Sequence, residues 1–257
     1  MNLRAAWIAY RTIVIREVLR FARIWVQTIV PPAVTTALYF VIFGHLIGSQ
    51  LDDMQGYAYV DYIVPGLIMM SVITQSYANV VSSFFGTKYH RNIEEMLTSP
   101  MSSVVIVAGF VTGGVARGMA VGGVVSLVAY AFAEPRIAHP GVALGIALLT
   151  AVVFALGGLI NAIYAKTFDD ISIVPTFVLT PLTYLGGVFY TIDLLPDFWQ
   201  QVSLVNPILY MINAFRYGLL GVTDIRLGLA FLITLLFALA LFLIAVRMIQ
   251  KGVGIKH

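Results

Sequence analysis

The chain has 257 residues, of which 60% are hydrophobic and 11% charged, with a net charge of +3 and no cysteine. A soluble domain of this length carries about a quarter charged residues, so the composition excludes an ordinary soluble protein. The absence of cysteine excludes disulfides and thiolate metal sites. Several apolar runs exceed the roughly 20 residues that a helix needs to cross a bilayer, which predicts an all-α polytopic membrane protein.

The first segment, residues 1–23, predicts an amphipathic helix ahead of the first apolar run. Its apolar side chains share one broad face, and its arginines lie elsewhere: Trp7, Ile8, Val14, Ile15, Val18 and Leu19 against Arg4, Arg11, Arg16 and Arg20. A basic helix of this kind lies along the inner membrane interface. The alternative is an ordinary basic flank that only sets topology.

Six apolar runs predict six membrane spans, at 24–46, 62–86, 103–131, 140–165, 171–190 and 227–248. The bias of lysine and arginine between the loops orients them. One set of loops holds Arg4, Arg11, Arg16, Arg20, Arg23, Lys88, Arg91, Lys166, Arg247, Lys251 and Lys256, and the other only Arg136, Arg216 and Arg226. Both termini are therefore predicted to be cytoplasmic, and residues 1–257 form a single transmembrane domain.

A short charged segment, residues 91–99, separates the second and third spans. Helical spacing places its apolar side chains on one face: Ile93, Met96 and Leu97. Glu94 and Glu95 lie near the helix N-terminus, where negative charge suits the dipole, and Pro100 ends the helix. Such a helix docks its apolar face in a partner groove while its charges, Arg91 included, set the register. The alternative is a helix lying on lipid headgroups, which the two glutamates disfavour because the inner leaflet is anionic.

The third span carries a ladder of glycines: Gly109, Gly113, Gly114, Gly118, Gly122 and Gly123. Their spacing permits close approach of another helix, either within the chain or in a dimer. Arg117 lies inside the ladder and must face protein or water. Its possible partners are Ser76, Tyr77, Asn79 and Asn161, or freed backbone carbonyls. Arg117 either contacts an anionic group of a substrate or anchors a bent helix.

Polar side chains in the second and fifth spans are candidates for a translocation path: Gln75, Ser76, Asn79, Ser83, Thr176, Thr180, Thr183 and Tyr184. The alternative is that they form hydrogen bonds between helices. In the fifth span, Pro175 and Pro181 each remove a helix hydrogen bond, which predicts a kink.

The segment 191–226 is too long for a turn and too apolar for a solvated loop. Pro196 and Pro207 suit the first turns of two short helices. Interfacial aromatic residues accompany them: Phe198, Trp199, Tyr210, Phe215 and Tyr217. We expect a re-entrant helical pair in the outer leaflet, buried against protein. The alternative is a seventh span at 204–222, which Asn206, Asn213 and Arg216 disfavour.

The sequence holds no nucleotide loop of the form G-x-x-x-x-G-K-[ST], so the chain is not expected to hydrolyse ATP by itself. The histidines do not form ligand spacing with carboxylates, so neither a metal site nor a cofactor is predicted in this chain.

Three stretches resemble the permease subunit of ATP-binding-cassette (ABC) type-2 exporters: YIVPGLIMMSV, RNIEEMLTSPMS and FDDISIVPTFVLTPLTYLGGVFYTIDLLPDFWQQVSLVNPILYMINAFRYG. The last is the most specific, because its order of prolines and glycines, its Asn206-Pro207 pair and Arg216 are similar to the family signature. The resemblance covers essentially the whole chain.

The resemblance implies a transporter made of two permeases, here a homodimer, and two copies of a separately encoded ATPase that binds ATP and Mg. It implies that the ATPase contacts the N-terminal helix, the segment 91–99, and the loop containing Asp169 and Asp170. Spans one, two and five would surround the path. The expected function is export of a lipid-like, drug-like or glycan substrate across a bacterial inner membrane by alternating access, with no nucleic-acid partner.

Two other functions remain open: a passive channel or scramblase, and a secondary transporter. A secondary transporter needs a titratable or ion-binding site near mid-membrane. The only mid-span charge is Arg117, which does not release its proton.

Overall fold

The computed structural model describes residues 2–51, 53–99, 101–134 and 137–254. Over these residues the chain is a bundle of helices with no strand beyond one isolated bridge between Met54 and Tyr57. The α-helices are α1 (Leu3–Arg23), α2 (Trp25–Tyr39), α3 (Tyr59–Tyr89), α4 (Asn92–Thr98), α5 (Ser103–Ala129), α6 (Pro140–Tyr164), α7 (Asp170–Val174), α8 (Thr180–Tyr184), α9 (Asp197–Val205), α10 (Pro207–Leu220) and α11 (Leu227–Lys251). The π-helical turns η1 (Phe40–Ile47) and η3 (Pro175–Leu179) and the 3-10 turns η2 (Gly48–Gln50) and η4 (Ile192–Leu194) complete the described elements.

Within the described residues, five helices are long and apolar enough to cross a membrane: Trp25–Gly44, Tyr59–Tyr89, Ser103–Ala129, Pro140–Tyr164 and Leu227–Lys251. They coincide with the first four expected spans and the sixth, with ends shifted by a few residues. The all-α, polytopic class predicted from composition is therefore confirmed.

The fifth expected span, 171–190, differs from the expectation. The chain is helical from residue 170 to 184 and then turns, with Gly187 at a φ of +75°, in the left-handed region that favours glycine. Inside the helical part, the predicted kink is a π-helical turn, where the Thr180 hydroxyl donates to the Pro175 carbonyl at 2.9 Å. Proline removes the regular hydrogen bonds here, and the remaining helix is shorter than the roughly 20 residues that span a bilayer.

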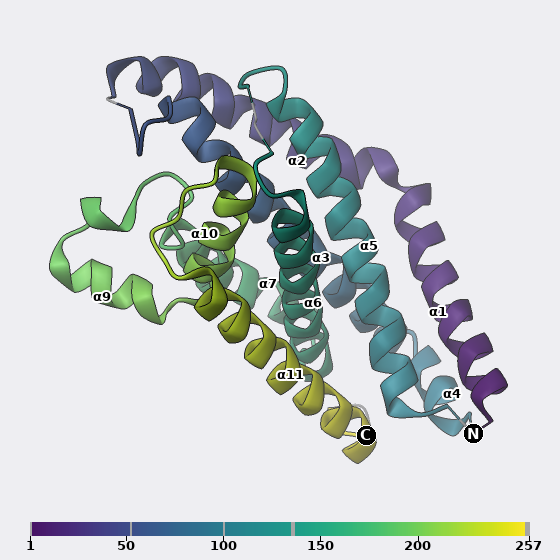
Figure 1. Ribbon diagram of the computed structural model, residues 1–257. Coiled ribbons are helices and arrows are strands. Elements are labelled where there is room, and N and C mark those ends of the chain that lie inside the picture. Colours follow the sequence, from purple (N-terminus) through teal and green to yellow (C-terminus); the bar gives the residue numbers. More distant parts are fainter. Residues whose placement is uncertain (1, 52, 100, 135–136, 255–257) are drawn as a thin grey trace.

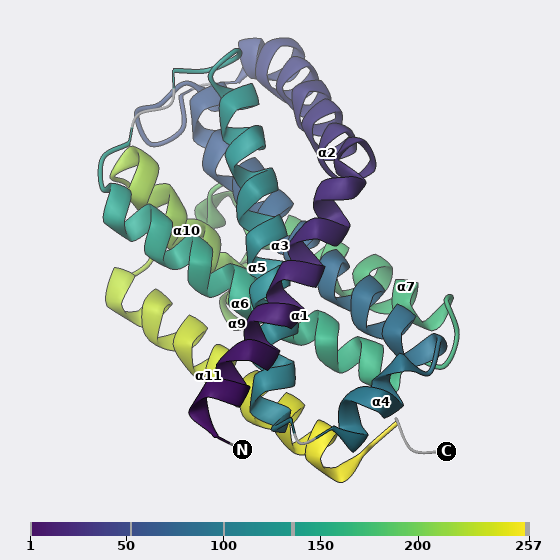
Figure 2. The same ribbon diagram turned by 90° about the vertical axis from the view of Figure 1, so that its right-hand side faces the viewer.

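Helices α3, α5 and α6 form the centre of the bundle, with α1 against α5 and α11 against α6 and α10 (Figures 1 and 2). Most of α3 is buried inside the chain, whereas most of the span Trp25–Gly44 is exposed. The start of α1, the end of α11 and the short helix α4 lie at the same end of the molecule (Figure 1).

The glycine ladder of α5 packs inside the chain. A Cβ added at Gly109 would lie 2.7 Å from Ile13 of α1, and one at Gly113 would collide with Glu17. A Cβ added at Gly118 would likewise collide with Ser76 of α3, whereas one added at Gly123 would face open space. Of the two uses predicted for the ladder, the structure therefore shows intramolecular packing, which places α1 close against α5.

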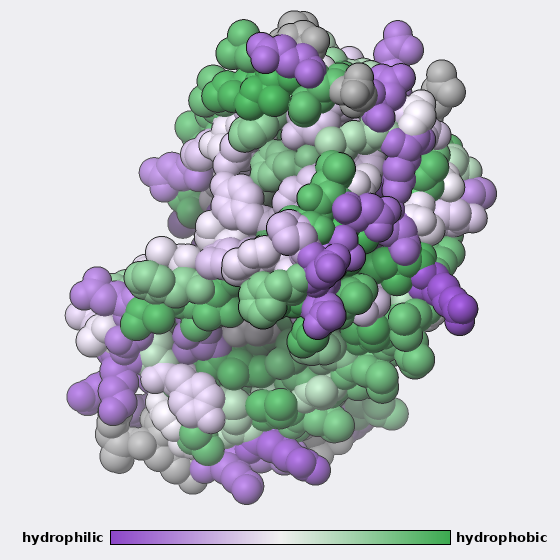
Figure 3. Space-filling model, turned by 90° about the vertical axis from the view of Figure 1, so that its left-hand side faces the viewer, coloured by the Kyte–Doolittle hydropathy of each residue, from purple (hydrophilic) through white to green (hydrophobic). Residues whose placement is uncertain are grey.

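The segment 191–226 forms two short helices, as predicted, and not a seventh span. Asn206 separates α9 from α10 with an extended backbone, and its side-chain oxygen accepts from the Ile208 amide at 3.0 Å. α10 is almost entirely buried, while α9 projects from the bundle (Figure 1). Figure 3 shows broad hydrophobic areas, interrupted by hydrophilic patches, on the face toward which α9 projects.

Arg216, counted from the sequence among the charges of the outer segments, is fully buried in α10. Its guanidinium lies 4.1 Å from the centre of the Tyr62 ring of α3 and donates to the Gly187 carbonyl at 2.5 Å. A second donor reaches Asn213 at 3.4 Å. One side chain thus joins α10, α3 and the turn that follows α8.

Candidate functional site

A cavity of about 350 Å³ lies between α3 and the α7–α8 segment. Its walls combine hydroxyl groups with apolar side chains; among them are Met70, Thr74, Tyr77, Val81, Ser82, Thr176, Leu179, Thr180, Thr183 and Tyr184. A second cavity, of about 240 Å³, lies between α2 and α3 and shares Met70 and Thr74 with the first. We call the two adjoining cavities the groove.

Four hydroxyls that line the groove donate to carbonyls of their own helical segment: those of Thr74, Ser82, Thr180 and Thr183. Thr74 donates to the Met70 carbonyl at 2.8 Å, and Thr183 donates to the Leu179 carbonyl at 2.7 Å. These hydroxyls make the wall of the groove polar, but their protons are already donated within the protein and do not require a hydrogen-bond acceptor on a bound molecule. This suits an amphipathic molecule better than a highly polar one.

The structure brings together five of the eight predicted path residues: Gln75, Thr176, Thr180, Thr183 and Tyr184 line the groove. The other three do not, because Ser76, Asn79 and Ser83 are buried on another face of α3, toward α5 and α1. Their spacing of three and four residues puts them on one helical face, separate from the face that carries Thr74 and Tyr77. Ser76, Asn79 and Ser83 therefore do not line the groove, and their place in a translocation path stays a prediction.

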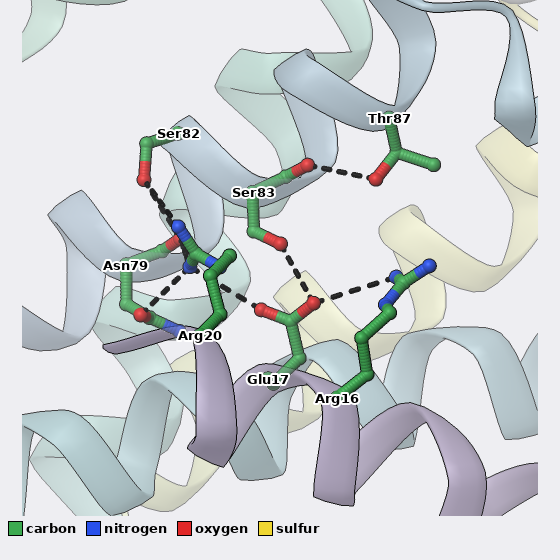
Figure 4. Close-up of polar contacts among 7 residues, drawn as sticks. All are labelled: Arg16, Glu17, Arg20, Asn79, Ser82, Ser83 and Thr87. Atoms are coloured by element: carbon green, nitrogen blue, oxygen red, sulfur yellow. Dashed lines mark hydrogen bonds and ion pairs between the residues drawn. The ribbon is translucent and has the colours of Figure 1, made fainter. Parts of the chain in front are cut away.

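The face of α3 away from the groove holds α1 through a buried carboxylate, Glu17 (Figure 4). Glu17 accepts from the Ser83 hydroxyl at 2.7 Å and forms ion pairs with Arg16 at 3.4 Å and Arg20 at 3.3 Å. Arg20 continues the network to the backbone oxygen of Asn79 at 2.9 Å and to its side-chain oxygen at 2.8 Å. The buried charge is thus paired and hydrogen-bonded, as burial requires.

Sequence reasoning missed Glu17. It is the only acidic residue in residues 1–23, and it lies four residues from both Ile13 and Phe21. These three residues form the buried stripe of α1. A lone acid in register with two apolar residues was the available signal, because i and i+4 positions share a helical face.

Arg117 donates to the side-chain oxygen of Gln75 at 2.7 Å. Gln75 was predicted as a path residue and not as a partner of this arginine. The structure shows no hydrogen bond from Arg117 to any of the four predicted side-chain partners. Since Gln75 also lines the groove, the arginine charge lies one side chain away from it.

The charged segment after α3 forms a helix, α4, close to the predicted range of 91–99. Arg91 precedes it in the left-handed conformation, with φ at 61°. Ile93 is only 1% exposed and packs into the core of its own chain, while Glu94 and Glu95 are exposed. Ile93 therefore packs inside its own chain and not on an exposed face of α4, which itself contacts α3. The role of α4 in docking a partner stays a prediction.

The side chain of Met96 is partly buried against the same core. The side chain of Leu97, predicted to share the docking face, lies outside the described part of the structure. The charged side chains on the exposed surface of α4 are those of Glu94 and Glu95.

The loop between α6 and α7 packs against the end of α3. The Phe168 ring packs against Phe85 at 4.9 Å and Tyr89 at 5.1 Å between centroids, at the end of α3. Asp170 accepts from the backbone N–H groups of Lys166 at 2.8 Å and Thr167 at 3.0 Å. These bonds lower the pKa of Asp170 below its ordinary value. Asp169, the other predicted contact residue, is exposed.

The all-helical fold agrees with a known family of membrane transporters. The family described as ABC-2 type transporter matches residues 8–220, and this chain belongs to that family.

Curated relatives extend the match over nearly the whole chain. The chain is 57% identical over 251 residues to the inner membrane transport permease YadH of Escherichia coli (strain K12), covering 97% of this chain and 98% of the relative. It is 24% identical over 185 residues to nodulation protein J of Rhizobium leguminosarum bv. viciae, covering 72% of this chain and 71% of that protein.

Proposed function

We propose that this chain is the permease subunit of an ATP-driven exporter in a bacterial inner membrane, with both termini in the cytoplasm. Two copies form a homodimer and work with two copies of a separate ATPase, which binds ATP and Mg. The substrate is a lipid-like, drug-like or glycan molecule with an amphipathic character, moved outward by alternating access. The family match and the similarity to an inner membrane transport permease support the membrane and the class of activity.

The observation that carries the proposal is that α3 joins the two kinds of site. One face of α3 lines the groove. Its inner end is continuous with α4 and packs against Phe168 of the α6–α7 loop. The two segments expected to contact the ATPase thus lie together at the end of the helix that borders the groove.

In this proposal, the exposed glutamates of α4 and the exposed Asp169 supply the contact with the ATPase. Closure of the ATPase pair on ATP moves α4 and the α6–α7 loop together. α3 moves with them, and the groove between α3 and the α7–α8 segment changes its access. The nucleotide favours one state only through its different affinity for the two states.

The mixed hydroxyl and apolar lining of the groove is the reason for proposing an amphipathic substrate. Its hydroxyls come mainly from α3 and the α7–α8 segment, and the Tyr39 and Tyr184 hydroxyls meet at 3.3 Å between α2 and α8. In the homodimer, α2 and the α7–α8 segment meet their counterparts across the dimer axis. The fifth span, 171–190, is then the broken helix that ends at Tyr184 together with the turn after it.

The test uses the permease reconstituted with its ATPase in liposomes. Glu94→Lys combined with Glu95→Lys is expected to abolish stimulation of the ATPase, because it reverses both exposed charges of α4. The matched control, Asp193→Lys with Asp197→Lys, reverses two exposed carboxylates in the segment before and at the start of α9 and is expected to keep stimulation.

Unchanged stimulation in the α4 variant would contradict the coupling role. Substrate movement without any ATPase would favour the passive channel or scramblase. Movement driven by a proton or sodium gradient would favour the secondary transporter.

A further inference from the structure

A third cavity, of about 560 Å³, lies between α1 and the inner end of α3. Arginines from α1 and hydroxyl groups from α3 line it, together with His90 and Asn92 at the start of the α4 segment. It lies on the side that carries the Glu17 network (Figure 4), and neither the groove nor the proposed coupling accounts for it.

The cavity has an excess of positive charge. Arg16, Arg20 and Arg23 line it, and Glu17 is the only carboxylate among its described lining residues. Glu17 is already bound by Arg16, Arg20 and Ser83. Within the described part of the chain, Arg23 makes no ion pair and no side-chain hydrogen bond, so its charge remains available.

Apolar side chains border the same cavity. Leu19 is 60% exposed and Ile24 is 39% exposed, and both line it beside the arginines. Trp25, which follows Ile24, is also exposed, as is typical of residues at a membrane interface. A cationic centre next to exposed apolar side chains fits a molecule with an anionic head and a hydrocarbon tail.

We propose that this cavity binds the phosphate group of an anionic phospholipid, with its acyl chains along Leu19 and Ile24. Basic pockets between helices on the cytoplasmic side of membrane proteins bind such headgroups. The phosphate takes guanidinium donors from Arg16 and Arg23, with the Ser82 hydroxyl on the facing wall. The lipid then bridges α1 and α3 beside the protein's own Glu17–Arg20 contact. A free phosphate ion shares the headgroup chemistry but gains nothing from the apolar border.

The test measures lipid bound to the purified full-length chain by native mass spectrometry, after incubation with phosphatidylglycerol or phosphatidylcholine. The wild-type chain is expected to retain phosphatidylglycerol preferentially. Arg16→Gln with Arg23→Gln is expected to reduce that retention about tenfold or more, from about 1 kcal/mol per arginine near an anionic surface. The matched control, Arg4→Gln with Arg11→Gln, removes the same charge from exposed positions of the same helix and is expected to retain the lipid.

Equal retention of phosphatidylglycerol by the two double variants would overturn the proposal. Displacement of the lipid by millimolar inorganic phosphate would also overturn it, in favour of a free-anion site. Because Arg16 also contacts Glu17 and lies over the Phe110 ring, Arg23→Glu serves as a second variant, which reverses an unpaired exposed charge and is expected to lose retention as well. The assay contains no ATPase, so its result does not depend on the transport proposal.

Discussion

The two faces of α3 use polar side chains in different ways. On the groove face, Thr74 bonds the carbonyl of its own helix. On the α1 face, Asn79 and Ser83 bond Arg20 and Glu17 of another helix. The first kind of residue leaves a wall that is polar but not committed to a partner, and the second kind fixes one helix to another. Gln75 combines the two uses, because it lines the groove and also accepts from Arg117 of α5.

The sharpest test of this difference is Glu17→Ala. It removes the acceptor of the buried Ser83 hydroxyl and the ion-pair partner of Arg20, which keeps its bonds to Asn79. This is expected to lower the free energy of unfolding by about 2–3 kcal/mol. Unfolding of the detergent-solubilised chain in a denaturant titration measures it. A loss below about 0.5 kcal/mol would mean that the α1 face is not held by this network.

Gln75 and Arg117 lie where the groove meets α5. Gln75→Leu removes the acceptor of an intramembrane arginine and is expected to destabilise the chain by about 1–2 kcal/mol. Adding Arg117→Met is expected to recover part of this loss, since no unpaired charge then remains. Non-additivity in this double-mutant cycle measures the pair.

A second experiment on Arg117 tests whether it contacts the substrate or anchors the helix. Arg117→Gln that folds normally but no longer supports export would indicate contact with an anionic substrate group. Loss of the folded protein would indicate a structural anchor.

Substitutions of hydroxyl residues on the groove face of α3 and of the α7–α8 segment are expected to change the stability of the chain only slightly. Thr74→Val with Thr180→Val removes hydroxyls that bond only their own helix, so the expected change in unfolding free energy is within about 0.5 kcal/mol. Thermal unfolding compared with Glu17→Ala measures the contrast. A loss as large as that of Glu17→Ala would erase the distinction between the two faces.

The smallest effect is expected outside the membrane, at Asp170. Its folded-state pKa is lowered by the Lys166 and Thr167 amides. Its contribution is therefore fully present above its unfolded pKa of about 3.9 and is lost as pH falls through the folded value. Exchange of the Lys166 and Thr167 amides is expected to stay slow from pH 7 to pH 5, after correction for intrinsic rates. Faster corrected exchange at pH 5 would contradict the assignment.

Hydropathy and proline positions were enough to predict five long apolar helices, the two short helices of segment 191–226 and a kink near Pro175. These features depend on local sequence, because apolar length and a missing amide act wherever the helix is placed. The short helix after α3 was predicted for the same reason.

Sequence did not show which side of each helix meets which neighbour. Spacing separates Ser76 from Thr74, but only the packing of α1 and α5 shows that Thr74 faces the groove. The burial of Ile93, the pairing of Arg117 with Gln75 and the burial of Arg216 likewise depend on residues far apart in the chain. Such contacts are set by tertiary structure, and a composition or periodicity argument does not contain them.

The Arg216 contacts with Tyr62 and Gly187 hold α3 near its N-terminal end. From Tyr62 to the end of α3 at Tyr89 the helix is about 40 Å long, at about 1.5 Å per residue. A displacement of about 2 Å applied at α4 then corresponds to a tilt of only about 3° along a helix of that length. The side chains of Thr74 and Tyr77, about halfway along this arm, would move roughly half as far as α4. In the proposed coupling, the position of this buried arginine along α3 would set how far the groove side chains move for a given displacement of α4.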